Sequence, residues 1–166
     1  MTIGETLLRE FDLEMKTTRR VLERVPSDKA TWKPHPKSFS LAHLAQLIAG
    51  MPGWIITMLG ETSLDLEKFP GYSDQKTDVL LTQFDMLVER ARASLKAAKD
   101  SDFDVEWSLQ RGPQVLFTQP RRHVVREHVN HMVHHRGQMT VYLRLLDVPV
   151  PSIYGPTADE KFGPPQ

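Results

Sequence analysis

Five of the seven histidines lie between His123 and His135, inside a stretch whose apolar spacing predicts one long helix over 120–146. His131 and His135 are four residues apart, so on a helix both rings project from one face at a spacing that can chelate a divalent ion. The apolar stripes predict that these histidines and His128 face inward, where a bundle normally places leucine or isoleucine. A buried imidazole without a partner costs about 1–3 kcal/mol. A metal ion is the partner that engages several such rings at once.

Two ligands from one helix do not make a tight metal site, so a third ligand is expected from elsewhere. His43, on the second predicted helix, is the first candidate, and His128, one turn before His131, is the alternative. Coordination positions left to water would make the site catalytic rather than purely structural. Met132 follows His131, which excludes the zincin motif, because that motif has a glutamate at this place. No residue stands out as a general base.

The bulk composition predicts one globular domain over 1–166 and argues against a nucleic-acid-binding or membrane protein. The chain is 40% hydrophobic and 25% charged, with a formal net charge of zero, as is usual for a single domain. The balanced charge gives no signal for nucleic acid, and no segment approaches the roughly 18 apolar residues of a membrane span. We therefore expect neither partner, and we expect a cytoplasmic protein. The absence of cysteine excludes disulfides and thiolate ligands, so thiol chemistry would need an external thiol.

Four long amphipathic segments predict an all-α fold, a four-helix bundle with long connections. The predicted helices cover 2–25, 41–59, 77–99 and 120–146. Pro52 should kink or break the second helix. Alternating apolar residues on both sides of an Arg-Gly-Pro-Gln turn predict a short hairpin or an irregular excursion between the third and fourth helices. The proline-rich residues 147–166 should form an extended tail that docks on the bundle.

The run His-Met-Val-His-His-Arg-Gly-Gln-Met-Thr-Val-Tyr-Leu-Arg at 131–144 resembles the DinB-like superfamily of bacterial four-helix bundles. Lys-Ser at 37–38, Met-Pro-Gly-Trp at 51–54 and the tail at 148–160 support the resemblance, which covers nearly the whole chain. It implies a divalent metal, often zinc or nickel, held by the histidines at 131 and 135 and by one from the second helix. It also implies a homodimer and a small-molecule substrate. It implies relatives that include thiol-dependent transferases and isomerases acting through a low-molecular-weight thiol, and many others that are described only as metal-dependent hydrolases.

The chain departs from the family pattern in the second helix. Alignment of the flanking motifs predicts the family histidine at the position that Leu47 occupies, whereas His43 lies one turn earlier, about 6 Å along the helix axis. One hypothesis is therefore a metal-dependent enzyme, a hydrolase or thiol transferase, whose metal is held by His131, His135 and His43. The alternative is a metal-free bundle that binds a small molecule or acts as a dimeric interaction protein. A third interpretation is a polar core seam whose histidines bind no ligand at all.

Overall fold

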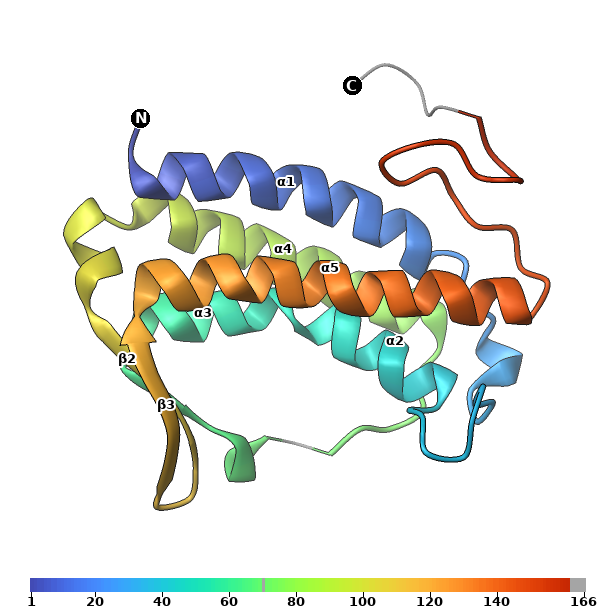
Figure 1. Ribbon diagram of the computed structural model, residues 1–166, viewed down its shortest axis with the longest axis horizontal. Coiled ribbons are helices and arrows are strands. Elements are labelled where there is room, and N and C mark those ends of the chain that lie inside the picture. The colour runs from blue at the N-terminus through green and yellow to red at the C-terminus, as the bar shows by residue number, and fades with distance from the viewer. Residues whose placement is uncertain (70, 162–166) are drawn as a thin grey trace.

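The structure, a computed structural model, describes residues 1–69 and 71–161 and confirms the helical bundle (Figure 1). Within these residues it has five α-helices, which are α1 (Ile3–Leu22), α2 (Leu41–Gly50), α3 (Pro52–Gly60), α4 (Thr77–Ala97) and α5 (Arg121–Leu145). Short 3-10 helices occur in the connections, namely η1 (Ser27–Lys29), η2 (Leu66–Lys68) and η3 (Asp100–Asp104). The predicted helices therefore all exist, with ends that differ by up to three residues from the predicted bounds.

Local signals explain where the helices begin and break. Thr2 and Glu5 form the expected capping box at α1, since the Glu5 N–H donates to Thr2 Oγ1 at 3.1 Å and the Thr2 N–H donates to Glu5 Oε2 at 2.8 Å. Ser40 caps α2. Pro52 divides the predicted second helix into α2 and α3, which meet at a bend of about 40°. The predicted break is confirmed, because proline has no N–H to continue the helical bonding.

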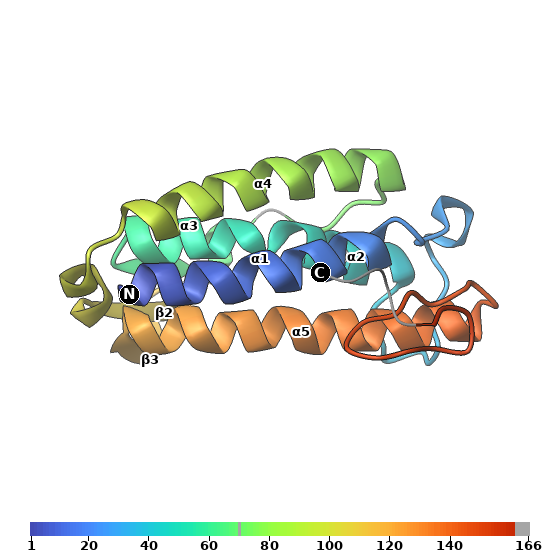
Figure 2. The ribbon, with the colours of Figure 1, turned by 90° about the horizontal axis from the view of Figure 1, so that it is seen from above.

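The five helices fill four positions of a bundle, because α2 and α3 follow each other along one edge of it (Figures 1 and 2). α1 packs against α4 and α5, and both α2 and α3 also pack against α4 and α5. The apolar stripes of the helices meet in one core. Its largest fully buried apolar side chains include Phe11, Phe84, Phe103 and Trp107. This core fixes the face of α5 that looks toward α2 and α3.

A small sheet at one end makes the fold mostly helical rather than all-α. It has the order β1 (Ser63–Asp65), β2 (Glu106–Arg111) and β3 (Gln114–Pro120), with β1 parallel to β2 and β2 antiparallel to β3. The predicted hairpin is confirmed, and Gly112, at its turn, has a φ of 53°, a conformation that glycine adopts readily. β1 lies between the second and third predicted helices, where the sequence predicts no strand. Three residues with one buried side chain are too short to show an alternating pattern.

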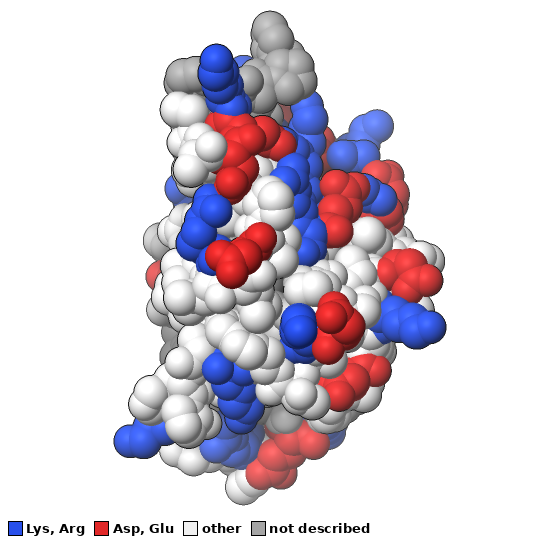
Figure 3. Space-filling view, turned by 90° about the vertical axis from the view of Figure 1, so that its right-hand side faces the viewer, with Lys and Arg blue, Asp and Glu red and all other residues white. Residues whose placement is uncertain are grey.

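The tail folds back on the bundle through ion pairs, as far as the described residues extend. Glu160 pairs with both Arg20 and Arg24 of α1, and Asp159 pairs with Arg144 of α5. Figure 3 shows this end of the molecule, where acidic and basic side chains are interspersed. The predicted tail continues through 162–166, which lie outside the described residues. Within the described residues no single helix is long and apolar enough to cross a membrane; only the bent pair α2 and α3 together meets the length and composition criteria.

Candidate functional site

α5 carries three histidines toward α2 and α3, but it buries them unequally. His128 and His135 are only 4% and 8% exposed, whereas His131 is an exposed residue. The helix runs without a break through all three positions, so their separations of three and four residues place them on one side of it. The prediction that all three rings are buried is therefore wrong for His131, which lies at the rim of the bundle.

His131 and His135 come together as their spacing predicts. Their Nε2 atoms lie 2.9 Å apart, and Nδ1 of His135 lies 2.8 Å from Oε1 of Gln138. Both contacts are hydrogen bonds when His135 donates its Nδ1–H to Gln138 and accepts the Nε2–H of His131 at its own Nε2. This arrangement keeps both rings neutral. Partial burial lowers the pKa of both histidines, and the proximity of His135 lowers the pKa of His131 further.

His128 is the most buried of the three histidines, and its ring is hydrogen-bonded to the backbone. Its Nε2 lies 2.9 Å from the carbonyl oxygen of Met51, at the break between α2 and α3. Its ring stacks on Trp54 with centroids 5.4 Å apart and planes 8° from parallel. Burial lowers the pKa of His128 to about 4, although the bond to Met51 opposes this shift. The ring is neutral at pH 7, and its Nε2–H is donated to the carbonyl instead of being replaced by a metal.

His43 lies in an aromatic stack on α2. Its ring stacks against Phe39 and Tyr72, with centroid distances of 4.2 Å and 3.8 Å. The residue after Tyr72 is also fixed, because the Ser73 N–H donates to Oε1 of Gln46 at 2.8 Å. Burial lowers the pKa of His43. The visible role of His43 is thus to hold the segment before α4 against α2.

The residues present do not fit a three-histidine metal centre. Among residues 1–69 and 71–161, no three His, Cys, Asp or Glu side chains are grouped so that they could hold one metal ion. The structure therefore does not bring His43 into such a group with His131 and His135. Leu47, at the position where the family resemblance implies a histidine, packs against the hydrophobic core instead. The donor set that remains is a two-nitrogen chelate.

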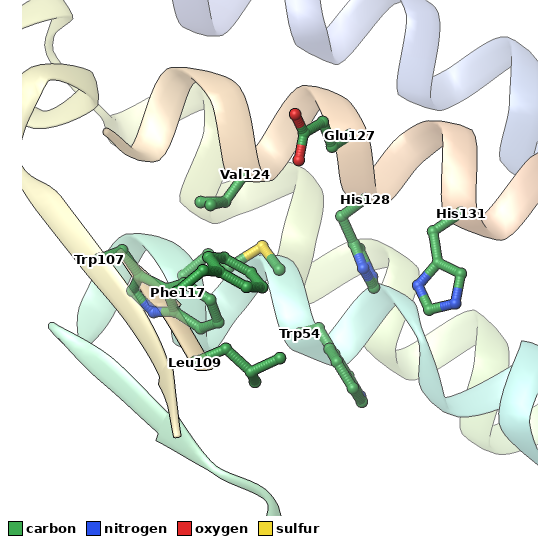
Figure 4. A pocket seen from close by; sticks show the side chains of 9 residues that line it. Trp54, Trp107, Leu109, Phe117, Val124, Glu127, His128 and His131 are labelled. Carbon is green, nitrogen blue, oxygen red and sulfur yellow. The ribbon is translucent and has the colours of Figure 1, made fainter. Parts of the chain in front are cut away.

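A pocket of about 270 Å³ opens beside the histidines, between α3, α5 and the β2–β3 hairpin (Figure 4). Most of its wall is aromatic or aliphatic. The lining residues are Trp54, Met58, Trp107, Leu109, Phe117, Val124, Glu127, His128 and His131. Trp107 and Phe117 lie on the hairpin side with ring centroids 6.2 Å apart, while Trp54 and His128 form the opposite side. His131 stands at the edge of this pocket, so the histidine pair and the pocket form one site.

Sequence reasoning found the histidines of this site but missed its aromatic walls. Trp107 and Phe117 lie in the hairpin, 53 and 63 residues along the chain from Trp54. No spacing rule joins residues of α3 to residues of β2 and β3. The one local signal was Trp54 itself, which lies on the same stripe of the second predicted helix as His43 and Leu47.

The Arg-Gly-Gln run after His135 has distinct structural roles. Arg136 is 2% exposed, forms an ion pair with Glu14 of α1 at 2.6 Å and donates to the hydroxyl of Tyr154 in the tail at 2.7 Å. Gln138 accepts from His135 and thereby sets its tautomer. The run therefore joins the histidine pair to the helix and tail that pack on the other side of α5.

Comparisons with known proteins agree with this architecture. The sequence profile of the DinB family matches residues 1–162. The chain is 54% identical over 37 residues to YrdA, an uncharacterized protein of Bacillus subtilis (strain 168). That match covers 21% of this chain and 22% of YrdA. The chain thus aligns with only about a fifth of the length of this relative.

Two crystal structures have a similar fold. A DinB-like protein from Bacillus cereus ATCC 10987 superposes with a TM-score of 0.71 and 20% identity, over 90% of this chain and 97% of that chain. YjoA, a DinB-like protein from Bacillus subtilis, superposes with a TM-score of 0.67 and 18% identity, over 86% of this chain and 92% of that chain. At these identities the likeness shows the fold and nothing about ligands.

Proposed function

The chain belongs to the DinB family, and we propose that it binds a small apolar molecule in the pocket between α3, α5 and the hairpin. The observation that carries this proposal is the pocket itself, about 270 Å³ of space with mostly aromatic and aliphatic walls. An apolar cavity of roughly 150 Å³ holds benzene, so this pocket has room for one ring and a short polar substituent. Apolar walls with a few polar groups are typical of ligand sites.

The lining residues have separable roles in binding. Trp54 and Phe117 offer aromatic surface whose burial by a ligand is favourable, and Trp107, which is 1% exposed, forms the wall behind it. His131 is the polar group at the rim. When its Nε2–H is donated to His135, its Nδ1 retains a lone pair and can accept a hydrogen bond. The bond between His128 and Met51 holds the ring that stacks on Trp54, so one wall is fixed before any ligand arrives.

The test uses the three tryptophans as reporters. Titration with 2-phenylethanol, followed by ¹H–¹⁵N NMR of the indole N–H groups, should shift the signals of Trp54 and Trp107. Trp32 should not respond, because it packs edge-on against Tyr142 outside the pocket. Unchanged indole signals for Trp54 and Trp107 at saturating millimolar alcohol would refute the proposed function.

A matched pair of hairpin variants separates pocket binding from surface adsorption. Leu109→Trp places bulk in the pocket wall and should abolish the response of Trp54. Leu116→Trp adds the same bulk to an exposed position on β3 that does not line the pocket, and the response should persist. Equal responses in the two variants would place the alcohol elsewhere on the surface.

The second candidate function is metal-dependent chemistry, and the 2.9 Å separation of the His131 and His135 nitrogens favours it. Two nitrogens bound to one zinc ion at about 2.0–2.1 Å lie roughly 3 Å apart. Hydrogen bonding of His135 to Gln138 is the arrangement that orients metal-binding histidines in other proteins. A divalent ion, when bound, lowers the pKa of a coordinated water or thiol, which is the basis of the expected hydrolase or thiol-transferase activity. In this candidate His131 and His135 hold the ion.

Metal content distinguishes this candidate from simple ligand binding. Untagged protein incubated with zinc or nickel and then desalted should keep little metal, because two nitrogens bind weakly. Leu47→His supplies the missing second-helix donor and should raise retention toward one ion per chain. Adding His131→Ala and His135→Ala to that variant should remove the ion again. If the parent protein takes up no more zinc or nickel than its own His131→Ala/His135→Ala variant, the second candidate is wrong.

A further inference from the structure

We propose that the pocket selects organic cations, namely small amines attached to an aromatic ring, over neutral and anionic molecules of the same shape. This inference rests on the proposed function, because it assigns a chemical class to the ligand of the same pocket. It is carried by the charge and the aromatic surfaces that the lining residues present.

Glu127 supplies the charge. Of the nine lining residues it is the one with a carboxylate, and no lysine or arginine is among them. Glu127 is exposed on α5 next to the pocket and brings the formal negative charge of a glutamate to its edge (Figure 4). The neighbouring arginines are engaged elsewhere, since Arg122 pairs with Asp104 and Arg126 pairs with Glu10. Within the described residues Glu127 itself forms no ion pair. Its charge is therefore available to a ligand.

The aromatic walls favour the same sign of charge. Trp54 lies on one side of the pocket, and Trp107 and Phe117 lie on the other (Figure 4). The faces of aromatic rings attract a cation and repel an anion, and tryptophan does so most strongly. The lone pair left on Nδ1 of His131, once its Nε2–H is donated, can accept an ammonium N–H but offers nothing to a carboxylate. The aromatic rings, the Glu127 carboxylate and Nδ1 of His131 thus all favour a positively charged ligand.

Three probes with one carbon skeleton test the selectivity. They are 2-phenylethylammonium, 2-phenylethanol and phenylacetate, each titrated while the indole signals of Trp54 and Trp107 are followed. We expect the ammonium to bind about fivefold more tightly than the alcohol, as a rim carboxylate and a partly exposed cation–π contact together supply. Phenylacetate should bind most weakly. Added salt should reduce the preference, because it screens the exposed carboxylate.

Glu127→Gln is the decisive variant, because it keeps the size of the side chain and removes its charge. The ammonium-to-alcohol ratio should fall below about twofold in this variant, with the affinity for the alcohol unchanged. Glu106→Gln removes an exposed carboxylate from neighbouring β2 that does not line the pocket, and it should leave the ratio as in the parent protein.

The outcomes separate the two proposals. If the alcohol binds as tightly as the ammonium, or if Glu127→Gln leaves the preference intact, the cation inference is overturned while the pocket remains a ligand site. If none of the three probes shifts the indole signals, the proposed function itself fails. A preference that disappears equally in Glu106→Gln would assign it to the general surface charge, and this too would overturn the inference.

Discussion

Acid should destabilise the protein through His128, and the effect can be calculated. The pKa of this histidine is lowered from 6.5 to about 4 by burial. Between these two values the unfolded chain binds a proton that the folded protein does not, so stability falls as the pH falls. Each pH unit in this window is worth about 1.4 kcal/mol. His128 alone should therefore cost about 2 kcal/mol between pH 7.5 and pH 5.0, and the loss should level off near pH 4.

The assay compares urea unfolding of the parent protein and His128→Gln at both pH values, followed by circular dichroism. Glutamine cannot titrate, but it can still donate to the carbonyl of Met51. His131 and His135, whose pKa values are also lowered, titrate in both proteins and largely cancel in the difference.

The difference in unfolding free energy between the two proteins should change by about 2 kcal/mol from pH 7.5 to pH 5.0. His128→Leu, which cannot donate, should differ from His128→Gln in overall stability but show the same change with pH. A change below about 0.5 kcal/mol in both variants would mean that His128 is not buried as a neutral ring, and the reasoning would be refuted.

Three further outcomes follow from α5. Arg136→Met should lower stability by about 3 kcal/mol in urea unfolding, because it leaves Glu14, which is 12% exposed, without its buried partner; a loss below about 1 kcal/mol would contradict this. Gly137→Ala should raise stability by about 0.5–1 kcal/mol in the same assay, since the added Cβ meets no atom within 4 Å and alanine favours the helix. Gln138→Leu should lower the pKa of His135 further in an NMR titration, because the hydrogen bond that it removes now raises that pKa; an unchanged or higher value would disprove the role of Gln138.

Local rules were sufficient for most of the fold. Each helix carries an apolar stripe with helical spacing. The starts of α1 and α2 coincide with capping residues and those of α3 and α5 with prolines, whereas α4 has no side-chain cap. The break at Pro52 and the hairpin turn at Gly112 follow from the same local chemistry. β1 could not be predicted in this way. Its three residues become a strand because β2 lies beside them, and that contact joins parts of the chain more than 40 residues apart.

The candidate site, too, was predictable only where local spacing along one helix determines it. The contact between His131 and His135 was predictable, because a separation of four residues on one helix is a purely local property. The pocket was not, because its walls come from α3, the hairpin and α5, and only the tertiary fold brings these together. The exposure of His131 was missed for a related reason. Helical spacing gives the direction of a side chain, but it does not tell where the neighbouring helix ends.

The imidazoles of α5 do not need a metal as their common partner, because they can form separate hydrogen bonds. His128 donates to a backbone carbonyl at the break that Pro52 makes, and His135 bonds to Gln138 one turn along its own helix. Within the pair of His131 and His135, Nδ1 of His131 is then the nitrogen that remains for a group from solution. The choice between ligand binding and metal binding therefore rests on His131. Whatever reaches that nitrogen, an ion or the polar end of a molecule in the pocket, determines what the site does.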